Sequence, residues 1–350
     1  MNSAQSDSAA ARDTPLLAVE SVAKRFPVRR GVFGALQGYL HAVDGVSFDL
    51  RPRETLGIVG ESGCGKSTLA RMIVRLIDPS EGAIRFGGED ITRLPAAEMR
   101  RFRRNIQFIF QDPYASLNPR LRAGDIVAEP LENFETFGWQ NRAERVQALF
   151  AKVRLGPDQV RKFPHEFSGG QRQRLGIARA LALNPSVIVA DEPVSALDVS
   201  VQAQIINLMM DLQAEFGLSY LFIAHDLAVV QHISHRVAVM YLGRIVEIAN
   251  RSALFASPLH PYTEALLDAA PAPNPAMRRK KAIVAGEVPS PMHPPPGCHF
   301  HPRCPLAEER CRIEAPALVE GRPGHFAACH VRAPAEAPQN SPNVDAGESR

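Results

Sequence analysis

The feature that most constrains the fold of this chain is a glycine-rich segment that directly follows a short apolar run. Residues 55–59 predict a buried strand, and the segment after them reads GESGCGKST, which matches G-x-x-x-x-G-K-[ST]. Its glycines allow successive backbone N–H groups to point at a phosphate, and the helix that follows adds its positive dipole end. We therefore expect a strand, a loop and a helix that bind a nucleoside triphosphate. The residues expected around its phosphates are Gly60, Glu61, Ser62, Gly63, Cys64, Gly65, Lys66, Ser67 and Thr68.

Two side chains of this loop carry specific expectations. Lys66 is expected to reach the β- and γ-phosphates, and Ser67 is expected to bind Mg²⁺. The alternative is a glycine-rich turn without a ligand. It is disfavoured because an apolar strand and a helical pattern flank the segment in the right order.

Length and composition exclude several classes of protein. A chain of 350 residues exceeds the usual size of a single core, so two or more lobes are expected. The sequence has no apolar run of about 18 residues and no basic and apolar leader at its start, which predicts a cytosolic chain that does not itself span a membrane. The net charge is only +3, and the basic cluster at 100–104 is more typical of a solvated helix end than of a nucleic-acid interface. We therefore expect no nucleic-acid partner.

The hydrophobic pattern predicts an α/β fold. Helical spacing is found at 67–76, 98–104 and 201–216, and 29–40 is expected to be a basic loop. Strands are expected over 16–26, 43–50, 83–86, 106–110, 187–190, 220–224 and 237–241. The later strands are nearly continuous apolar runs that alternate with helices, which predicts a parallel sheet covered on both faces. The earlier strands alternate apolar and polar residues, as in a half-exposed sheet.

Composition also divides the chain into segments. Helical spacing with few strand signals predicts an inserted helical subdomain at about 112–181. From about residue 266 prolines and then cysteines accumulate, which predicts a small, irregular extension. The expected segments are a tail at 1–14, the main domain at 15–265, the extension at 266–333 and a disordered tail at 334–350.

Polar side chains that follow the apolar strands are the candidates for chemistry. Asp191 is expected to hold Mg²⁺ through its water shell, and Glu192 to orient and deprotonate an attacking water; a solvated or helix-capping acid pair is the alternative. His225 ends the next strand, where it would contact the γ-phosphate and the water, although a lone histidine is more often packed in the core. Gln111 also ends a strand and is a candidate contact to Mg²⁺ or the water.

A second glycine-containing segment precedes a helical stretch. Ser168 is expected to cap this helix, and the glycines after it expose several backbone donors. The residues alone leave two interpretations open, a second phosphate site or a well-capped helix. The segment consists of Ser168, Gly169, Gly170 and Gln171.

Taken in order, these motifs resemble those of the ATP-binding cassette (ABC) ATPases over residues 16 to about 250. The corresponding segments are Walker A at 60–68, the Q-loop Gln111, the signature at 168–171, Walker B at 187–191, the catalytic carboxylate Glu192, the D-loop at 195–198 and the switch histidine His225. The resemblance implies a P-loop NTPase core with an antiparallel β subdomain, and it implies that Phe26 stacks on adenine. It also implies that the signature binds the nucleotide held by a facing subunit, so that ATP closes a dimer and hydrolysis opens it.

A narrower resemblance concerns the cargo. Segments 112–120, 196–204, 260–263 and 286–291 look like those of the oligopeptide/dipeptide importer ATPases, especially the second of their two paired subunits. This implies a heterodimer with a related ATPase, two membrane permeases and a peptide-binding protein, with this chain peripheral at the cytoplasmic face of the inner membrane. Nickel importers and other relatives share these motifs, so the same machine for nickel or another small solute is the alternative.

Two other classes are less favoured. A soluble cassette protein not linked to transport would need a second cassette or a long coiled coil. A regulatory module without turnover would lack Glu192 or His225, and both are present. We therefore expect hydrolysis.

The extension contains four cysteines, spaced C-x5-C-x6-C-x17-C, with histidines between them. Four thiolates suit a [4Fe–4S] cluster or tetrahedral Zn²⁺, although the C-x2-C pairs usual in zinc sites are absent. Members of the resembled family can carry an iron–sulfur cluster here, which favours the cluster over zinc and over metal-free thiols. Its ligands would be Cys298, Cys304, Cys311 and Cys329.

Overall fold

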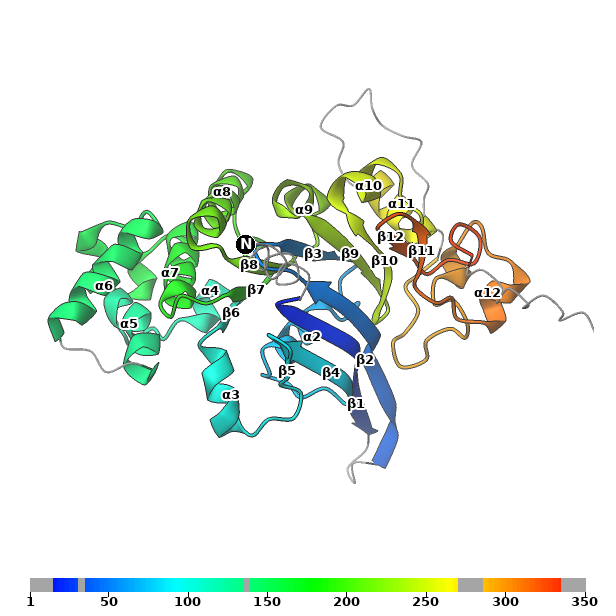
Figure 1. Cartoon of the computed structure of the whole chain (residues 1–350), viewed down its shortest axis with the longest axis horizontal. Helices are drawn as coiled ribbons and strands as arrows, with labels where there is room; N and C mark the ends of the chain where they lie inside the picture. Colours follow the sequence, from blue (N-terminus) through cyan, green and yellow to red (C-terminus); the bar gives the residue numbers. More distant parts are fainter. Residues whose placement is uncertain (1–14, 31–34, 135–138, 270–285, 335–350) are drawn as a thin grey trace, which may run out of the picture.

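A computed structural model describes residues 15–30, 35–134, 139–269 and 286–334. Both predicted tails therefore lie outside the described residues, apart from Pro334. Figure 1 shows a central β structure with a helical lobe on one side and the C-terminal extension on the other. Within the described part of the chain, no helix combines the length and the apolar character needed to cross a membrane.

The central sheet has the strand order β11-β12-β10-β9-β3-β8-β7-β6. Its middle pairs, from β9 through β3, β8 and β7 to β6, are parallel, as the sequence predicts. The bounds of these five strands are β3 Thr55–Val59, β6 Ile106–Ile109, β7 Val187–Asp191, β8 Ser219–Ile223 and β9 Arg236–Tyr241.

Alternate residues of one strand belong to two different cores. In β7, Ile188 and Ala190 pack into the core that contains α8 (Val199–Phe216) and α9 (Leu227–Ile233). Val187 and Val189 pack into the core on the other face, with α2 (Lys66–Ile73). Both faces are thus covered, which is why the strand reads as one continuous apolar run.

The register of the parallel strands places their carboxyl ends together. Ile58 pairs with Ile223, and Ile223 pairs in turn with Asp191. Because parallel strands all end at the same edge, the loop after β3, the acids at the end of β7 and the histidine after β8 meet there.

A smaller antiparallel sheet has the order β2-β1-β4-β5. Its strands are β1 Leu17–Arg30, β2 Ala35–Leu50, β4 Glu81–Phe86 and β5 Glu89–Asp90. The predicted loop at 29–40 is wrong over most of its length, because β1 and β2 continue as a paired ribbon as far as Arg30 and Ala35. Residues 35–40 are mostly exposed. A strand without a buried face needs no alternation of apolar and polar residues, and that alternation is the signal by which a half-buried strand is predicted.

The helical lobe lies between β6 and β7 in the chain. Apolar residues of its helices, among them Ile126, Phe150 and Leu175, form one buried cluster. Its elements are α4 Pro113–Ser116, α5 Ala123–Phe134, α6 Trp139–Lys152, α7 Gly169–Leu181 and the 3-10 turns Pro157–Arg161 and Pro164–Glu166. The other helices outside the extension are α3 Ala96–Arg103, α10 Arg251–Ala256 and α11 Pro261–Ala269, and the domain boundary predicted after residue 265 falls inside α11.

The extension is less irregular than the sequence predicts. It contains a 3-10 turn at His301–Arg303, α12 (Glu309–Ile313), β11 (Val319–Arg322) and β12 (His325–Ala327). β12 pairs antiparallel with β10 (Arg244–Asn250), so the central sheet runs without interruption into the extension.

A buried glutamate fastens this junction. Glu247 of β10 is fully buried and lies 2.6 Å from His325 Nε2 of β12, and it accepts the N–H groups of Leu259 and His260. Burial alone would raise the pKa of Glu247, but these hydrogen bonds outweigh burial and hold that pKa below its usual range. The ionised carboxylate is therefore the form that stabilises the junction.

Candidate nucleotide-binding site

The loop after β3 has the backbone of an anion-binding nest. Gly63 and Gly65 adopt φ of 79° and 105°, which L side chains rarely adopt. A Cβ atom on Gly65 would lie 2.0 Å from the carbonyl oxygen of Ala42, and one on Gly60 would lie 2.1 Å from that of Met240. Close backbone packing thus explains the glycines at both ends of the loop, whereas Gly63 faces open space.

Lys66 closes the loop from inside. Its side chain is buried, and its Nζ donates to the carbonyl oxygens of Gly60 and Glu61 at 2.8 and 3.0 Å. Cys64 is also buried, and burial raises the pKa of its thiol. The loop therefore carries a fixed cation and an unreactive neutral thiol.

Asp191 and Ser67 lie side by side at the edge of the sheet. The hydroxyl of Ser67 donates to Asp191 Oδ1 at 2.8 Å. Burial raises the pKa of Asp191, and the hydrogen bond from Ser67 only partly opposes that shift. A hydroxyl and a carboxylate are hard oxygen ligands of the kind that Mg²⁺ prefers. A divalent cation here would also favour the ionised form of the buried carboxylate.

Three predicted catalytic side chains converge at the same edge. Gln111 Nε2 donates to Glu192 Oε2 at 3.1 Å, and His225 Nδ1 lies 3.3 Å from the same oxygen. Glu192 has a positive φ of 47°, and its N–H donates to the carbonyl oxygen of Ile223. The side chain of Glu192 is 16% exposed and that of His225 57%, so the cluster opens to solvent, where a water and a phosphate can enter.

Many of these residues line one pocket of about 530 Å³, whereas Gly60, Glu61, Cys64 and Asp191 do not line it. The predicted residues that line it are Phe26, Ser62, Gly63, Gly65, Lys66, Ser67, Thr68, Gln111, Glu192 and His225. Leu40, Ala42 and Pro291 also line it, although the sequence motifs do not predict them as site residues. Leu40 pairs with Phe26 across the β1–β2 ribbon, and a strand prediction there would have placed it beside Phe26. Nothing in the local sequence indicates that Pro291 lies at the site.

The signature segment, residues 168–171, does not line this pocket. Ser168 caps α7, as predicted, by accepting the N–H of Gln171 at 3.3 Å, while Gln171 Oε1 accepts the N–H of Ser168. A Cβ on Gly170 would lie 2.5 Å from a methyl of Val201, so packing against α8 requires that glycine. None of the four signature residues is among those that line the pocket. Within this chain they form a well-capped helix.

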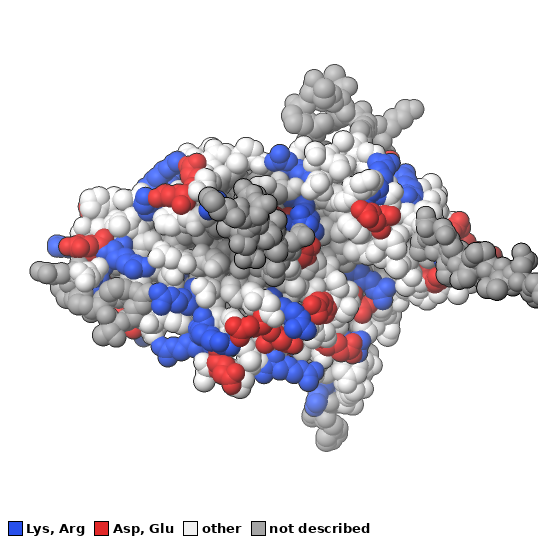
Figure 2. All heavy atoms as spheres, in the orientation of Figure 1, with Lys and Arg blue, Asp and Glu red and all other residues white. Residues whose placement is uncertain are grey.

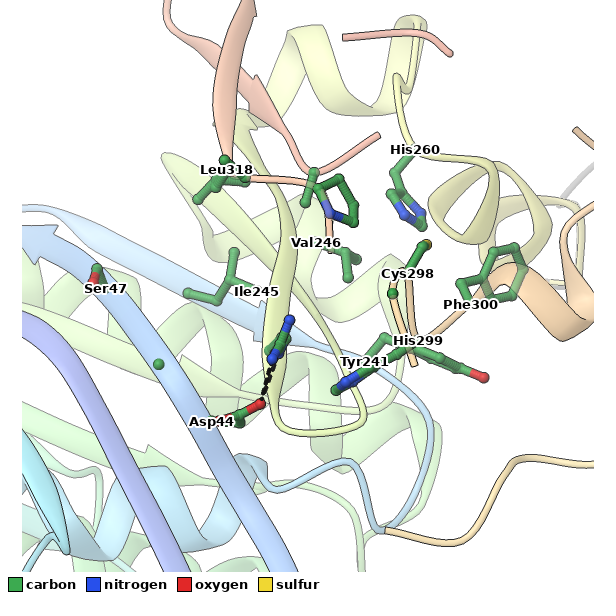
Figure 3. A pocket seen from close by; sticks show the side chains of 16 residues that line it. Asp44, Ser47, Tyr241, Ile245, Val246, His260, Cys298, His299, Phe300 and Leu318 are labelled. Atoms are coloured by element: carbon green, nitrogen blue, oxygen red, sulfur yellow. Dashed lines mark hydrogen bonds and ion pairs between the residues drawn. The ribbon is translucent and has the colours of Figure 1, made fainter. Parts of the chain in front are cut away.

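The four cysteines of the extension are free thiols, and Cys311 and Cys329 are buried. Among the residues that the structure describes, no group of three or more His, Cys, Asp or Glu side chains is arranged to hold a metal ion. The structure thus gives no support to the predicted cluster or to the zinc alternative. Cys298 instead lines a cavity of about 420 Å³ between the extension and β10 (Figure 3).

Charged side chains of both signs alternate over the face shown in Figure 2. The basic cluster at 100–104 overlaps the end of α3, as predicted. Its arginines contact their own neighbours: Arg101 pairs with Glu89 at 2.6 Å, and Arg100 lies over the ring of Phe134. These contacts are typical of a solvated helix end.

Comparisons with known proteins place these features in a family. A family model described as ABC transporter matches residues 43–195, and one described as oligopeptide/dipeptide transporter, C-terminal region, matches residues 246–311. Among solved structures, the dimeric ABC transporter cassette MJ0796 is 29% identical with a TM-score of 0.61, over 67% of this chain and 98% of that one.

Curated relatives match nearly the whole chain. A probable peptide ABC transporter ATP-binding protein, y4tS of Sinorhizobium fredii, is 60% identical over 94% of this chain and 93% of its own length. The oligopeptide transport ATP-binding protein AppF of Bacillus subtilis is 53% identical over 92% of this chain and 99% of its own length. The chain therefore belongs to the ATP-binding proteins of ABC transporters, in the group that carries the oligopeptide/dipeptide transporter C-terminal region.

Proposed function

We propose that this chain hydrolyses ATP to energise the import of dipeptides and oligopeptides through a membrane permease complex. The observation that carries the proposal is the convergence of Gln111, Glu192 and His225 on one side of a pocket whose other side is the phosphate-binding loop. The peptide cargo is supported by the match of residues 246–311 and by the names of the relatives. Nickel or another small solute, and a cassette protein not linked to transport, are not favoured by these matches.

The residues of the pocket have complementary roles in the proposed reaction. Lys66 and the backbone N–H groups of the loop bind the phosphates, and Phe26 offers a ring for adenine to stack on. Glu192 takes a proton from the water that attacks the γ-phosphorus, while the bond from that phosphorus to the ADP oxygen breaks. His225 and Gln111 hold the carboxylate and the water in line. Mg²⁺, bound near Ser67, Asp191 and Gln111, would neutralise charge on the phosphates.

The functional unit in this proposal contains two ATPase chains. The signature residues stand apart from the chain's own pocket, and the MJ0796 cassette was solved as a dimer. We infer that Ser168, Gly169, Gly170 and Gln171 contact the ATP of a facing, homologous ATPase subunit. The heterodimer would dock peripherally on two permease subunits at the cytoplasmic face of the inner membrane and receive cargo from an extracytoplasmic peptide-binding protein.

Reconstitution tests this function. We expect the chain, purified with its sister ATPase and both permeases in liposomes together with the binding protein, to take up labelled oligopeptide only with MgATP. Parallel assays with radioactive nickel measure the alternative cargo. Nickel uptake without peptide uptake would overturn the peptide assignment, and absence of ATP-dependent uptake of either would overturn the transport role.

An iron–sulfur centre in the extension stays a prediction from the sequence. It rests on the four cysteines and their spacing. Burial first, and then the neighbouring Cys311, Cys304 and Cys329, raises the pKa of Cys298 to about 11. A bound metal centre would oppose that shift and favour the thiolate forms that bind it. We expect anaerobic purification to yield about four iron and four sulfide per chain. Stoichiometric zinc, or no metal, would refute the cluster. Cys311→Ser removes one predicted ligand and should lower the iron content, whereas the control Cys64→Ala changes a cysteine outside the extension and should not.

A further inference from the structure

The C-terminal extension directly contacts the phosphate-binding loop. Arg303, in the 3-10 turn of the extension, lies 2.9 and 3.0 Å from the two carboxylate oxygens of Glu61. The side chain of Arg303 is 7% exposed and that of Glu61 29%. A bidentate arginine–carboxylate pair has a defined geometry, and partial burial protects it from screening by salt.

Every polar group of Glu61 has a hydrogen-bond partner. Its N–H donates to the hydroxyl of Tyr262 in α11 at 2.9 Å, and its carbonyl oxygen accepts from Lys66 Nζ. Its carboxylate is held by Arg303. The start of the loop is thus fixed from outside by α11 and the extension, and from inside by the lysine expected to bind phosphate.

A group of aromatic rings packs around the Arg303–Glu61 pair, which we call the clamp. Phe300 is buried, and its ring centre lies 5.3 Å from that of Tyr241 and 5.4 Å from that of Tyr262. The guanidinium of Arg303 lies 5.9 Å from the rings of Phe300 and Tyr241. Figure 3 shows Phe300, Tyr241 and His260 around the cavity between the extension and the cassette. Rigid, packed rings keep Arg303 in one orientation.

The extension reaches the nucleotide pocket at a second point. The carbonyl oxygen of Pro291 accepts the N–H of His41 in β2 at 3.1 Å. Pro291 itself lines the pocket, together with Leu40 and Ala42 on either side of His41. One contact of the extension is therefore at the phosphate loop, and the other is on the wall that contains Phe26.

We propose that the extension forms part of the nucleotide site and that Arg303 is a positioning residue, which holds the phosphate-binding loop through Glu61 in the conformation that accepts a triphosphate. This inference rests on the proposed binding of ATP to the loop. Gly63 and Gly65 allow that loop many conformations. Without the clamp, part of the free energy of nucleotide binding would be needed to order the loop, and the affinity would fall. Arg303 acts on binding and not on the bond-breaking step, because its hydrogen-bond partners are Glu61 and Tyr241, and neither belongs to the catalytic cluster.

Nucleotide titration and steady-state kinetics of the full-length chain test the clamp. Arg303→Ala weakens binding of a fluorescent ATP analogue and raises the KM for ATP about tenfold, whereas kcat at saturating ATP stays near the parent value. Arg303→Lys, which keeps the charge but loses the bidentate geometry, gives an intermediate effect. Glu61→Gln weakens binding as well, and adding Arg303→Ala to it weakens binding little further, because both changes remove the same contact.

The matched control is Arg310→Ala. Arg310 pairs with Glu314 at 2.8 Å in the same extension but on its exposed surface, so its removal leaves nucleotide binding unchanged. Lys66→Ala separates the proposed nucleotide site from the proposed clamp. If this variant retains its affinity for nucleotide, the assignment of the nucleotide site is wrong. If it loses affinity while folded Arg303→Ala binds within about twofold of the parent, the clamp alone is wrong. Should Arg303→Ala not fold, Arg303→Lys and Glu61→Gln decide by the same criterion.

Discussion

Glu192→Gln should leave MgATP binding intact and lower steady-state hydrolysis by about 10²- to 10⁴-fold, the usual contribution of a general base. The carboxamide keeps the size of the side chain, so Gln111 and His225 can still contact its oxygen, but an amide does not accept a proton from water. ATP then stays bound, and the contacts that favour the closed dimer are not lost.

Phosphate release and light scattering measure both consequences. With MgATP, the variant purified with its sister subunit should form a stable dimer while releasing almost no phosphate. Glu215→Gln is the control, because Glu215 is a half-exposed carboxylate of α8 that pairs with Lys152, and neither residue lines the pocket. Hydrolysis near the parent rate in Glu192→Gln would refute the assignment of the base, and failure to dimerise would refute ATP-driven closure.

Lys66→Ala should reduce nucleotide affinity about 100-fold. The change removes the cation expected at the β- and γ-phosphates. It also removes the Lys66 hydrogen bonds to the carbonyl oxygens of Gly60 and Glu61, which loosens the loop. Two charged hydrogen bonds of ordinary strength account for a loss of this size.

Titration with a fluorescent ATP analogue measures the loss, and thermal unfolding without nucleotide shows whether the fold survives. Lys152→Ala is the control, since Lys152 is a half-exposed lysine in the helical lobe. Unchanged affinity in a folded Lys66→Ala would contradict the assignment of the phosphate-binding loop. A loss in both variants would indicate a general defect instead.

Much of the fold follows from short stretches of sequence. The apolar runs at 55–59 and 187–190 become β3 and β7, and the helical spacing at 201–216 becomes most of α8. These predictions depend on periodicity and on caps such as Ser168, which act within a few residues. The strands predicted at 16–26 and 43–50 correspond to the inner parts of β1 and β2, but the outer part of the ribbon does not follow from the sequence, because it is mostly exposed and has no apolar alternation.

The sequence by itself determined the chemistry, since the order of glycine, lysine, carboxylate and histidine after apolar strands specifies a nucleotide-hydrolysing edge. Only the tertiary structure decided which distant segments complete that edge. The contact between Arg303 and Glu61 joins positions 242 residues apart, and β12 extends the central sheet beyond β10. Local patterns contain no information on such pairings, because they depend on strand register and on the packing of whole elements against one another.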